Sequence, residues 1–418
     1  MFCCRKLFCI AALLIASPGL AERRTSAVFL HPDGMGLNTW GAVRLWAVGP
    51  EGRLAWDSLP ALAVYVGPMS DGVTASSNGG ATSHAWGVRA EKKSFGFIAG
   101  RPINRARSGA SATIMVEAMR AGKAVGIVNS SAVTEPGTGA FLAQVANRKD
   151  QAAIAEQILA ARPQVILGGG ERFFLPEGMQ GRHGIGARSD GRNLVEDAQR
   201  AGYSVVYTRE ELLGLPEDAS RVLGLFAADD TFNGGTEDAL AAADQPVFQA
   251  QAPRFDEMIE AAVRILARDP DGFLLVGNEE ATDNMAGDNH AAAVLEAGAG
   301  ADRAVAAVLR HAARDPGLTL VVASDSDCGG LQVSGPTGAA EGATRAANGA
   351  TIDGPFLAAP DRDGRRLRFV VHWAAEDDVA GGLVARGTGP GAIALHGTID
   401  STDVYSALYL GLFGRLPD

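Results

Sequence analysis

The sequence predicts an α/β fold with a mainly parallel sheet flanked by helices. Short apolar runs rich in β-branched residues recur along the chain, and segments of helical character lie between many of them. This alternation favours parallel strands joined by crossover helices. Acidic residues follow several of the apolar runs, at the strand ends where open α/β sheets place their ligands. The chain has 418 residues, 47% of them hydrophobic, which is enough for one large domain.

The expected elements follow in order along the chain. Strands are predicted at 27–30, 124–128, 164–170, 203–207, 221–227, 272–276, 318–323 and 368–372. Helices are predicted after Ser77 and at 112–121, 195–201, 255–267 and 402–412. The segment 334–354 is rich in Gly, Ala and Thr and predicts a surface loop or lid. Neither an internal repeat nor a second linker-bounded domain is evident, so residues 22–418 are interpreted as one catalytic domain with inserted loops.

The first 21 residues have the pattern of a secretory signal peptide. Arg5 and Lys6 precede an apolar run at 7–16, and Pro18 leads to small residues ending at Ala21. We therefore predict cleavage after Ala21 and export to the periplasm or the extracellular space. The apolar run is too short for a lasting membrane span, although a membrane-anchored form stays open as an alternative.

Cysteine content and net charge limit the kinds of protein that this chain can be. Three of the four cysteines lie in the first 21 residues, which leaves only Cys328 in the predicted mature protein and allows no internal disulfide. The formal net charge is −11 and becomes −13 when Arg5 and Lys6 are removed. An acidic protein of this kind is a poor candidate for sequence-independent binding of nucleic acid. Carboxylates clustered around cations would account for part of the charge.

The segment 73–89 contains a candidate anion-binding turn. Ser76 and Ser77 precede Asn78, Gly79 and Gly80, and a run of small residues follows that predicts the first turns of a helix. Glycines allow a tight turn and a close approach of substrate to the backbone. The N–H groups and the dipole at a helix N-terminus favour a bound phosphate.

Acidic residues follow two of the predicted strands closely. Asp33 follows the strand 27–30, and the segment 277–290, which follows the strand 272–276, carries four carboxylates and a histidine within twelve residues. Carboxylates crowded at a strand end repel one another unless cations lie between them. These segments therefore indicate metal binding.

Taken in order, these segments resemble the motifs of alkaline phosphatases. The resemblance is carried by D-G-M-G at 33–36, S-S-N-G-G-A-T at 76–82, V-T-E-P-G-T-G-A-F at 133–141 and S-D-S-D-C-G-G-L at 324–331. Q-V-I-L-G-G-G at 164–170 resembles a part of the family's scaffold. Membership would imply a three-layer sandwich around a mainly parallel sheet, and metal-dependent hydrolysis of small phosphate monoesters through a phosphoserine. It also admits a homodimer.

The resemblance implies two catalytic residues. Counting back from Gly87, Ser77 falls on the nucleophilic serine and Ser76 on the family's aspartate; a shift by one residue would make Ser76 the nucleophile, so it stays as the alternate. Arg148, thirteen residues after Glu135, falls on the arginine that holds the phosphate. A guanidinium offers paired N–H donors to two phosphate oxygens, which a lysine cannot do.

The resemblance also implies a set of metal ligands. The glutamate ligand of the family falls nominally on Asn278, so that Glu279 or Glu280 must take its place, and the family's threonine position is Gly137. His290 follows Asp283 by seven residues where the family has four. The implied ligands are Asp33, Glu135, Glu279 or Glu280, Asp283, His290, Asp325 and Asp378.

Zn²⁺ and Mg²⁺ are the ions that the resemblance implies. Two positions that hold zinc-binding histidines in the family are Ser326 and Asp378 here. Imidazole suits zinc, whereas carboxylate and hydroxyl oxygens favour Mg²⁺, Ca²⁺ or Mn²⁺. We therefore expect a divergent site that takes harder ions at the altered positions. Cys328 is expected to be a small buried residue rather than a metal ligand.

Three other functions are compatible with parts of this pattern. A phosphodiesterase or sulfatase of the same superfamily would share the sheet and the metals. The altered ligands would also suit an exported phosphate-binding protein without catalysis. A serine hydrolase is disfavoured, because no G-x-S-x-G turn surrounds Ser76 or Ser77.

Overall fold

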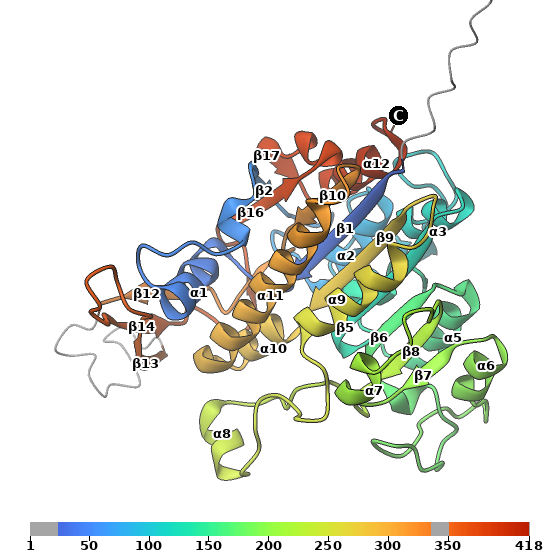
Figure 1. Ribbon diagram of the computed structural model, residues 1–418, viewed down its shortest axis with the longest axis horizontal. Coiled ribbons are helices and arrows are strands. Elements are labelled where there is room, and N and C mark those ends of the chain that lie inside the picture. The colour runs from blue at the N-terminus through green and yellow to red at the C-terminus, as the bar shows by residue number, and fades with distance from the viewer. Residues whose placement is uncertain (1–23, 336–350, 418) are drawn as a thin grey trace, which may run out of the picture.

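The computed structural model describes residues 24–335 and 351–417, and a ten-stranded sheet forms its centre (Figure 1). Of its strands, only β16 runs antiparallel to its neighbours. The predicted α/β class with a mainly parallel sheet is thereby confirmed. The predicted signal peptide lies outside the described residues. In sheet order the strands are β17 (His396–Asp400), β2 (Ala61–Val66), β16 (Leu383–Thr388), β10 (Leu318–Val322), β1 (Ser26–Pro32), β9 (Phe273–Glu279), β5 (Ala124–Ala132), β6 (Val165–Gly169), β8 (Val222–Leu225) and β7 (Ser204–Val206).

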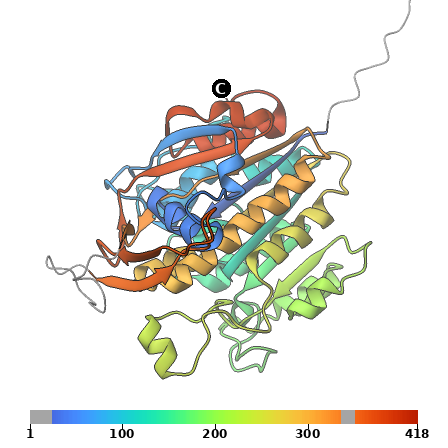
Figure 2. The ribbon, with the colours of Figure 1, turned by 60° about the vertical axis from the view of Figure 1, so that its left-hand side comes forward.

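Helices cover both faces of this sheet and form two apolar cores, one on each side (Figure 2). One core contains residues of α1 (Leu37–Val48), α7 (Arg209–Leu213), α9 (Phe255–Leu266), α10 (Ala281–Gly287) and α11 (Ala291–Ala312). The other contains residues of α2 (Ser77–Trp86), α3 (Ile114–Arg120), α5 (Gln151–Ala161), α6 (Leu194–Arg200) and α12 (Asp403–Phe413). The remaining helices are α4 (Pro136–Gly139), α8 (Glu237–Ala242), η1 (Trp56–Ser58), η2 (Glu171–Phe173) and η3 (Pro390–Ala394).

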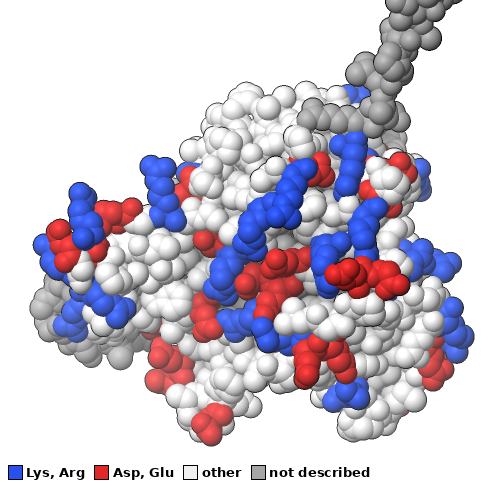
Figure 3. Space-filling view, in the orientation of Figure 1, with Lys and Arg blue, Asp and Glu red and all other residues white. Residues whose placement is uncertain are grey.

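The central strands are apolar because both of their faces are covered. Every residue of β1, β5, β9 and β10 is buried, as is typical of a parallel sheet between two helical layers. On the outside, α9 and α11 are joined by ion pairs between Arg303 and Asp256 (3.0 Å) and between Arg310 and Glu260 (3.5 Å). Acidic and basic side chains are interspersed over this face (Figure 3).

Three smaller sheets lie outside the central one. A three-stranded sheet contains β12 (Gln332–Ser334), β14 (Arg368–His372) and β13 (Ile352–Leu357). The strand predicted at 368–372 therefore forms, although it lies in this sheet rather than in the main one. The ends of the predicted loop 334–354 belong to β12 and β13, and its residues 336–350 lie outside the described part. In the other two sheets, β3 (Phe97–Ile98) pairs with β4 (Arg101–Pro102) as a hairpin, and β11 (Asp327–Cys328) pairs antiparallel with the distant β15 (Asp378–Val379).

Most of the predicted elements are confirmed with ends shifted by a few residues. The largest difference is β5, which continues four residues beyond the predicted end and reaches Ala132. β9 continues three residues beyond its predicted end and reaches Glu279. Within residues 24–335 and 351–417, no helix combines the length and the apolar character that a membrane crossing needs.

The topology brings acidic residues from distant parts of the sequence to one edge of the sheet. β1 lies between β9 and β10, and all three run parallel. Asp33, Glu280 and Asp325 follow the carboxyl ends of these strands, and Glu135 follows β5 on the other side of β9. Ligands of open α/β sheets bind at this edge.

Replacing a core leucine of β9 tests this packing. Leu275 is fully buried, so Leu275→Ala removes apolar contacts and leaves a cavity on a central strand. We expect its free energy of unfolding to fall by about 2–5 kcal/mol in urea titrations. The matched variant Leu213→Ala, at a side chain that is 49% exposed, should stay within about 0.5 kcal/mol of the parent. Equal losses in the two variants would contradict the assigned core.

Candidate active site

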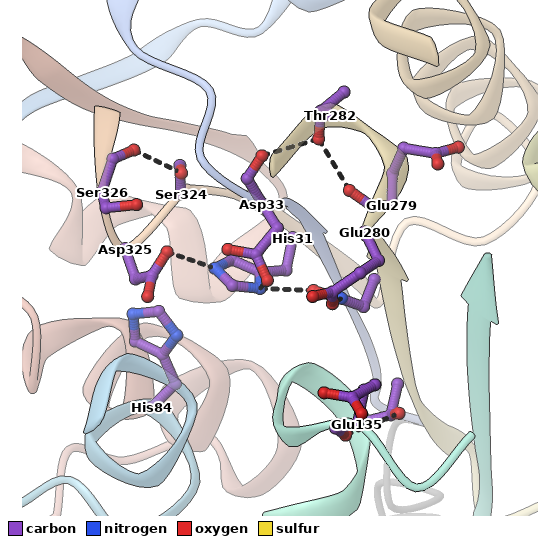
Figure 4. Close-up of polar contacts among 12 residues, drawn as sticks. His31, Asp33, His84, Glu135, Glu279, Glu280, Thr282, Ser324, Asp325 and Ser326 are labelled. Carbon is purple, nitrogen blue, oxygen red and sulfur yellow. Dashed lines mark hydrogen bonds and ion pairs between the residues drawn. The ribbon is translucent and has the colours of Figure 1, made fainter. Parts of the chain in front are cut away.

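Carboxylates that follow three neighbouring strands lie together at the edge of the sheet (Figure 4). Asp33, Glu280 and Asp325 are each at most 3% exposed. The N–H of Asp33 donates to the carbonyl of Glu279 at 3.2 Å. The hydroxyl of Thr282 lies 2.6 Å from the carbonyl of Asp33 and 2.7 Å from that of Glu279. These contacts fix the ends of β1 and β9 relative to each other and place the side chains of Asp33 and Glu280 together.

The carboxylates of this group lack the partners that buried charges require. Burial, followed by the charge of Asp325, raises the pKa of Asp33 well above its usual range. Burial and neighbouring acids likewise raise the pKa of Glu280 and of Asp283. Both side-chain oxygens of Asp33 and of Asp325, and Oδ1 of Asp283, are buried without a hydrogen-bond partner among the described residues. Divalent cations fit such a donor set, because they would satisfy these oxygens and cancel the repulsion.

The donors form two groups that could each hold a cation. In the first, one ligand atom each from His31, Asp33 and Asp325 lie within 4.8 Å of one another. Asp283, Cys328 and Asp378 form the second group by the same measure. Cys328 is buried as expected, but its sulfur also lies among these carboxylates, a position that its sequence context did not indicate.

Asp378 and Ser326 meet at the edge of the second group. The hydroxyl of Ser326 donates to Oδ1 of Asp378 at 2.6 Å. Burial, followed by the charge of Asp325, raises the pKa of Asp378 to about 6. The two residues that stand at the family's histidine positions are therefore in direct contact with each other.

Of the two glutamates at the end of β9, only Glu280 faces Asp33 (Figure 4). Glu280 accepts from the side-chain amide of Asn278 at 2.5 Å. The side chain of Glu279 points to the other side, toward Ser130 and Arg254, and burial raises its pKa to about 7. β9 ends at Glu279, and Glu280 has the helical backbone angles of the α10 N-cap, so the two side chains leave the backbone in different directions. The structure favours Glu280 over Glu279.

The structure places His290 away from both groups of donors. His290 lies at the N-cap of α11, and its Nδ1 is 3.1 Å from the carbonyl oxygen of Gly235. α10 extends from Ala281 to Gly287, and the chain then turns through Asn289, whose φ is +53°. The longer spacing after Asp283 thus places His290 outside the cluster. The structure does not bring it to the ligand position that the resemblance implies.

The first turn of α2 packs against Asp325. A Cβ atom added to Gly80 would lie 2.4 Å from the side chain of Asp325, so only glycine allows this approach. α2 begins at Ser77, and Ser76 is its N-cap residue. The hydroxyl of Ser76 donates to the carbonyl of Lys92, whereas that of Ser77 has no hydrogen-bond partner within the described chain. The free hydroxyl makes Ser77 the better candidate for a nucleophile.

Arg148 lies at the mouth of the site. Its guanidinium donates to Glu135 at 2.5 Å, and its side chain is 43% exposed. A pocket of about 430 Å³ is lined by this arginine, Ser76, Asn78 and neighbouring lysines. Both members of this ion pair act on Glu280, whose pKa is raised by burial: the charge of Glu135 raises it further, and the charge of Arg148 lowers it. Arg148 therefore lines the basic pocket and also interacts with the buried acidic cluster.

His31 and Asn278 belong to the site although neither was predicted as a ligand. The Nδ1 atom of His31 lies 2.6 Å from Oδ1 of Asn278. A Cβ at Gly137 would come within 2.3 Å of the Asn278 side chain, which explains why no threonine stands at position 137. The signal for His31 was its position near the carboxyl end of β1, two residues before Asp33, because ligands of open α/β sheets bind at this edge.

The family model described as alkaline phosphatase matches residues 25–359, well over half of the chain. The chain belongs to the alkaline phosphatase family. It is 27% identical over 343 residues to the membrane-bound alkaline phosphatase of Bombyx mori, with 72% of this chain and 60% of that protein covered. It is 30% identical over 347 residues to the streptomycin-6-phosphate phosphatase of Streptomyces griseus, with 72% and 73% covered. The match thus spans less than two thirds of the Bombyx protein.

Solved structures of alkaline phosphatases share the fold. The Thermus thermophilus enzyme superposes with a TM-score of 0.73 at 22% identity, covering 95% of this chain and 93% of that one. A second match is a variant of the alkaline phosphatase from the Antarctic bacterium TAB5, with a histidine replaced by glutamate and Mg bound in its M3 site. It superposes with a TM-score of 0.70 at 16% identity, covering 94% of this chain and 99% of that one. The three-layer architecture of this family member agrees with both.

The raised pKa values predict how stability depends on pH in metal-free protein. A folded-state pKa above the unfolded value means that the native state holds extra protons, so stability falls as pH rises through the window. Asp378 and Glu279 have folded-state pKa values of about 6 and about 7, against about 4 in the unfolded chain, so this window lies between about pH 4 and 7. The thermal midpoint of chelator-treated protein should therefore drop across it, and added Mg²⁺ or Zn²⁺ should reduce the drop by neutralising the carboxylates that face the two donor groups.

The variant Asp33→Asn serves as the control for this titration. It removes a carboxyl group whose raised pKa makes the native state hold an extra proton, so the metal-free variant should show a shallower decline than the parent. A midpoint that rises with pH over the same range, or that ignores added cations, would contradict the assigned electrostatics.

Proposed function

We propose that this protein hydrolyses small phosphate monoesters in a metal-dependent reaction through a phosphoserine. The observation that carries the proposal is the convergence of unpartnered buried carboxylates with the N-terminal turn of α2. Membership of the alkaline phosphatase family supports it. A site that only bound phosphate would need neither several buried carboxylates nor a free serine hydroxyl beside them.

In this proposal Ser77 is the nucleophile and Arg148 holds the phosphoryl group. The oxygen of Ser77 attacks phosphorus as the alcohol leaves, and water then releases inorganic phosphate from the serine. The N-terminus of α2 favours the negative charge of the phosphoryl oxygens. The carboxylate of Glu135 orients the guanidinium of Arg148 so that its remaining N–H donors can bind two of those oxygens.

The cluster is proposed to hold more than one divalent cation. The proposed aspartate ligands are Asp33, Asp283, Asp325 and Asp378. The proposed glutamate ligands are Glu280 and Glu135. Such cations would act as Lewis acids that stabilise charge on the serine and leaving-group oxygens. The oxygen-rich part around Glu280 and Glu135 suits Mg²⁺, Mn²⁺ or Ca²⁺. The TAB5 variant that holds Mg supports magnesium there.

Export is proposed as well. The pattern of residues 1–21 supports a cleaved signal peptide and a location in the periplasm or outside the cell. N-terminal sequencing of the protein recovered from an expressing bacterium would test this: a mature chain that begins at Glu22 is the expected result.

Hydrolysis of p-nitrophenyl phosphate tests the proposed activity. Chelator-stripped protein should be inactive at alkaline pH and should recover turnover when Zn²⁺, Mg²⁺, Mn²⁺ or Ca²⁺ is added back alone or in pairs. In Ser77→Ala, kcat should fall by at least about a thousandfold, because the covalent step is lost.

Two comparisons make this experiment decisive. The neighbouring variant Ser76→Ala removes the hydroxyl that is bonded to the carbonyl of Lys92, and it should retain turnover within about tenfold of the parent. Bis-p-nitrophenyl phosphate should be the poorer substrate. A preference for the diester would favour a phosphodiesterase, whereas phosphate affinity without turnover under any metal condition would overturn the proposed catalysis.

A further inference from the structure

The imidazole of His31 faces a buried carboxylate without a hydrogen bond between them. Its Nε2 atom lies 3.5 Å from Oδ1 of Asp325, and both side chains are fully buried. Neither atom has a hydrogen-bond partner within the described residues. The nearest oxygen of Asp33 is 3.9 Å from Nδ1 of the same ring. Two buried acceptors that face each other at this distance need a cation or a proton between them.

Asn278 determines which ring nitrogen carries the proton. Its side-chain amide donates to Glu280 at 2.5 Å, so its oxygen is directed at Nδ1 of His31, 2.6 Å away. An amide oxygen can only accept a hydrogen bond, and Nδ1 must therefore carry the hydrogen. The other ring nitrogen, Nε2, faces the carboxylates and can offer its lone pair to a bound cation.

We propose that Nε2 of His31 is the nitrogen ligand of a cation held by Asp33 and Asp325. Asn278 is its positioning residue: it fixes the tautomer and links the ring to Glu280. Metal-binding histidines commonly donate their second N–H to an oxygen acceptor in this way. One nitrogen and two carboxylates form a donor set that suits Zn²⁺. His31 on β1 thus provides an imidazole for the cation, whereas the family has its histidine at the position of Ser326.

This inference rests on the proposed metal-dependent function, but it can be tested without catalysis. Zinc-loaded protein is studied by X-ray absorption fine structure at the zinc edge, where imidazole ligands give characteristic outer-shell scattering. Zinc affinity is measured by competition with a chromophoric chelator. The parent should show imidazole scattering. The variant His31→Gln should lose it, and its zinc affinity should fall by about tenfold or more.

Two histidine variants serve as matched controls. His290→Gln removes the imidazole that lies against Gly235, and it should change neither the scattering nor the affinity. His84 lies near His31, with ring centroids 5.4 Å apart, but its Nε2 is 2.9 Å from the hydroxyl of Tyr65. His84→Gln should therefore keep the imidazole signal. Loss of the signal in either control with retention in His31→Gln would overturn the proposal.

Substitutions at Asn278 separate positioning from folding. Asn278→Leu has a similar size but no acceptor for the ring N–H, so zinc affinity should fall by about 10- to 100-fold. Asn278→Asp restores an acceptor and should recover part of that loss. Equal affinities in the two variants would contradict the positioning role.

The remaining outcomes distinguish this inference from the proposed function. A parent that lacks imidazole scattering, or that binds no zinc, would overturn the inference, and His31 would then be paired with Asp325 through a proton. Intact zinc and imidazole readouts in a protein without phosphatase activity would support the inference while refuting the activity. Turnover in a protein without the imidazole signal would support the phosphatase activity while refuting the role of His31.

Discussion

Mutual repulsion among buried carboxylates is the constraint on which this structure depends. The parallel sheet brings Asp33, Glu280 and Asp325 together from three neighbouring strand ends, where each residue is at most 3% exposed. Burial and proximity raise the pKa of Asp33 and of Glu280, so neither is stable as an uncompensated anion. Cations resolve the conflict and supply the electrophiles that phosphoryl transfer uses. The same feature therefore limits stability and enables the proposed chemistry.

The sequence predicted the fold and the acidic core of the site more reliably than the residues around them. Buried parallel strands are near-continuous apolar runs, and an acid at a strand's carboxyl end must lie at the ligand-binding edge, so Asp33 and Asp325 could be placed together. Side-chain direction and insertions were harder to predict. Glu279 is the last residue of β9 and Glu280 is the N-cap of α10, so the direction of each side chain depends on where the strand ends. An insertion of three residues moves His290 to the start of α11.

Departures from the family's motifs are coupled in space. Asn278 stands where the resemblance implied a glutamate, and its side chain fills the space beside Gly137, where a threonine was expected. The same amide contacts both His31 and Glu280. Ser326 and Asp378, at two histidine positions, bond to each other. A set of substitutions that fit one another indicates a reorganised site rather than a decayed one.

Anomalous X-ray diffraction from crystals equilibrated with Zn²⁺ and, separately, Mn²⁺ would test the central claim most directly. Data collected on both sides of each metal's absorption edge would locate any bound ion. We expect one peak between Asp33 and Asp325 and another between Asp283 and Asp378. Crystals without a peak at either place, with the carboxylates in the same arrangement, would show that protons rather than cations neutralise the cluster, and would contradict the account.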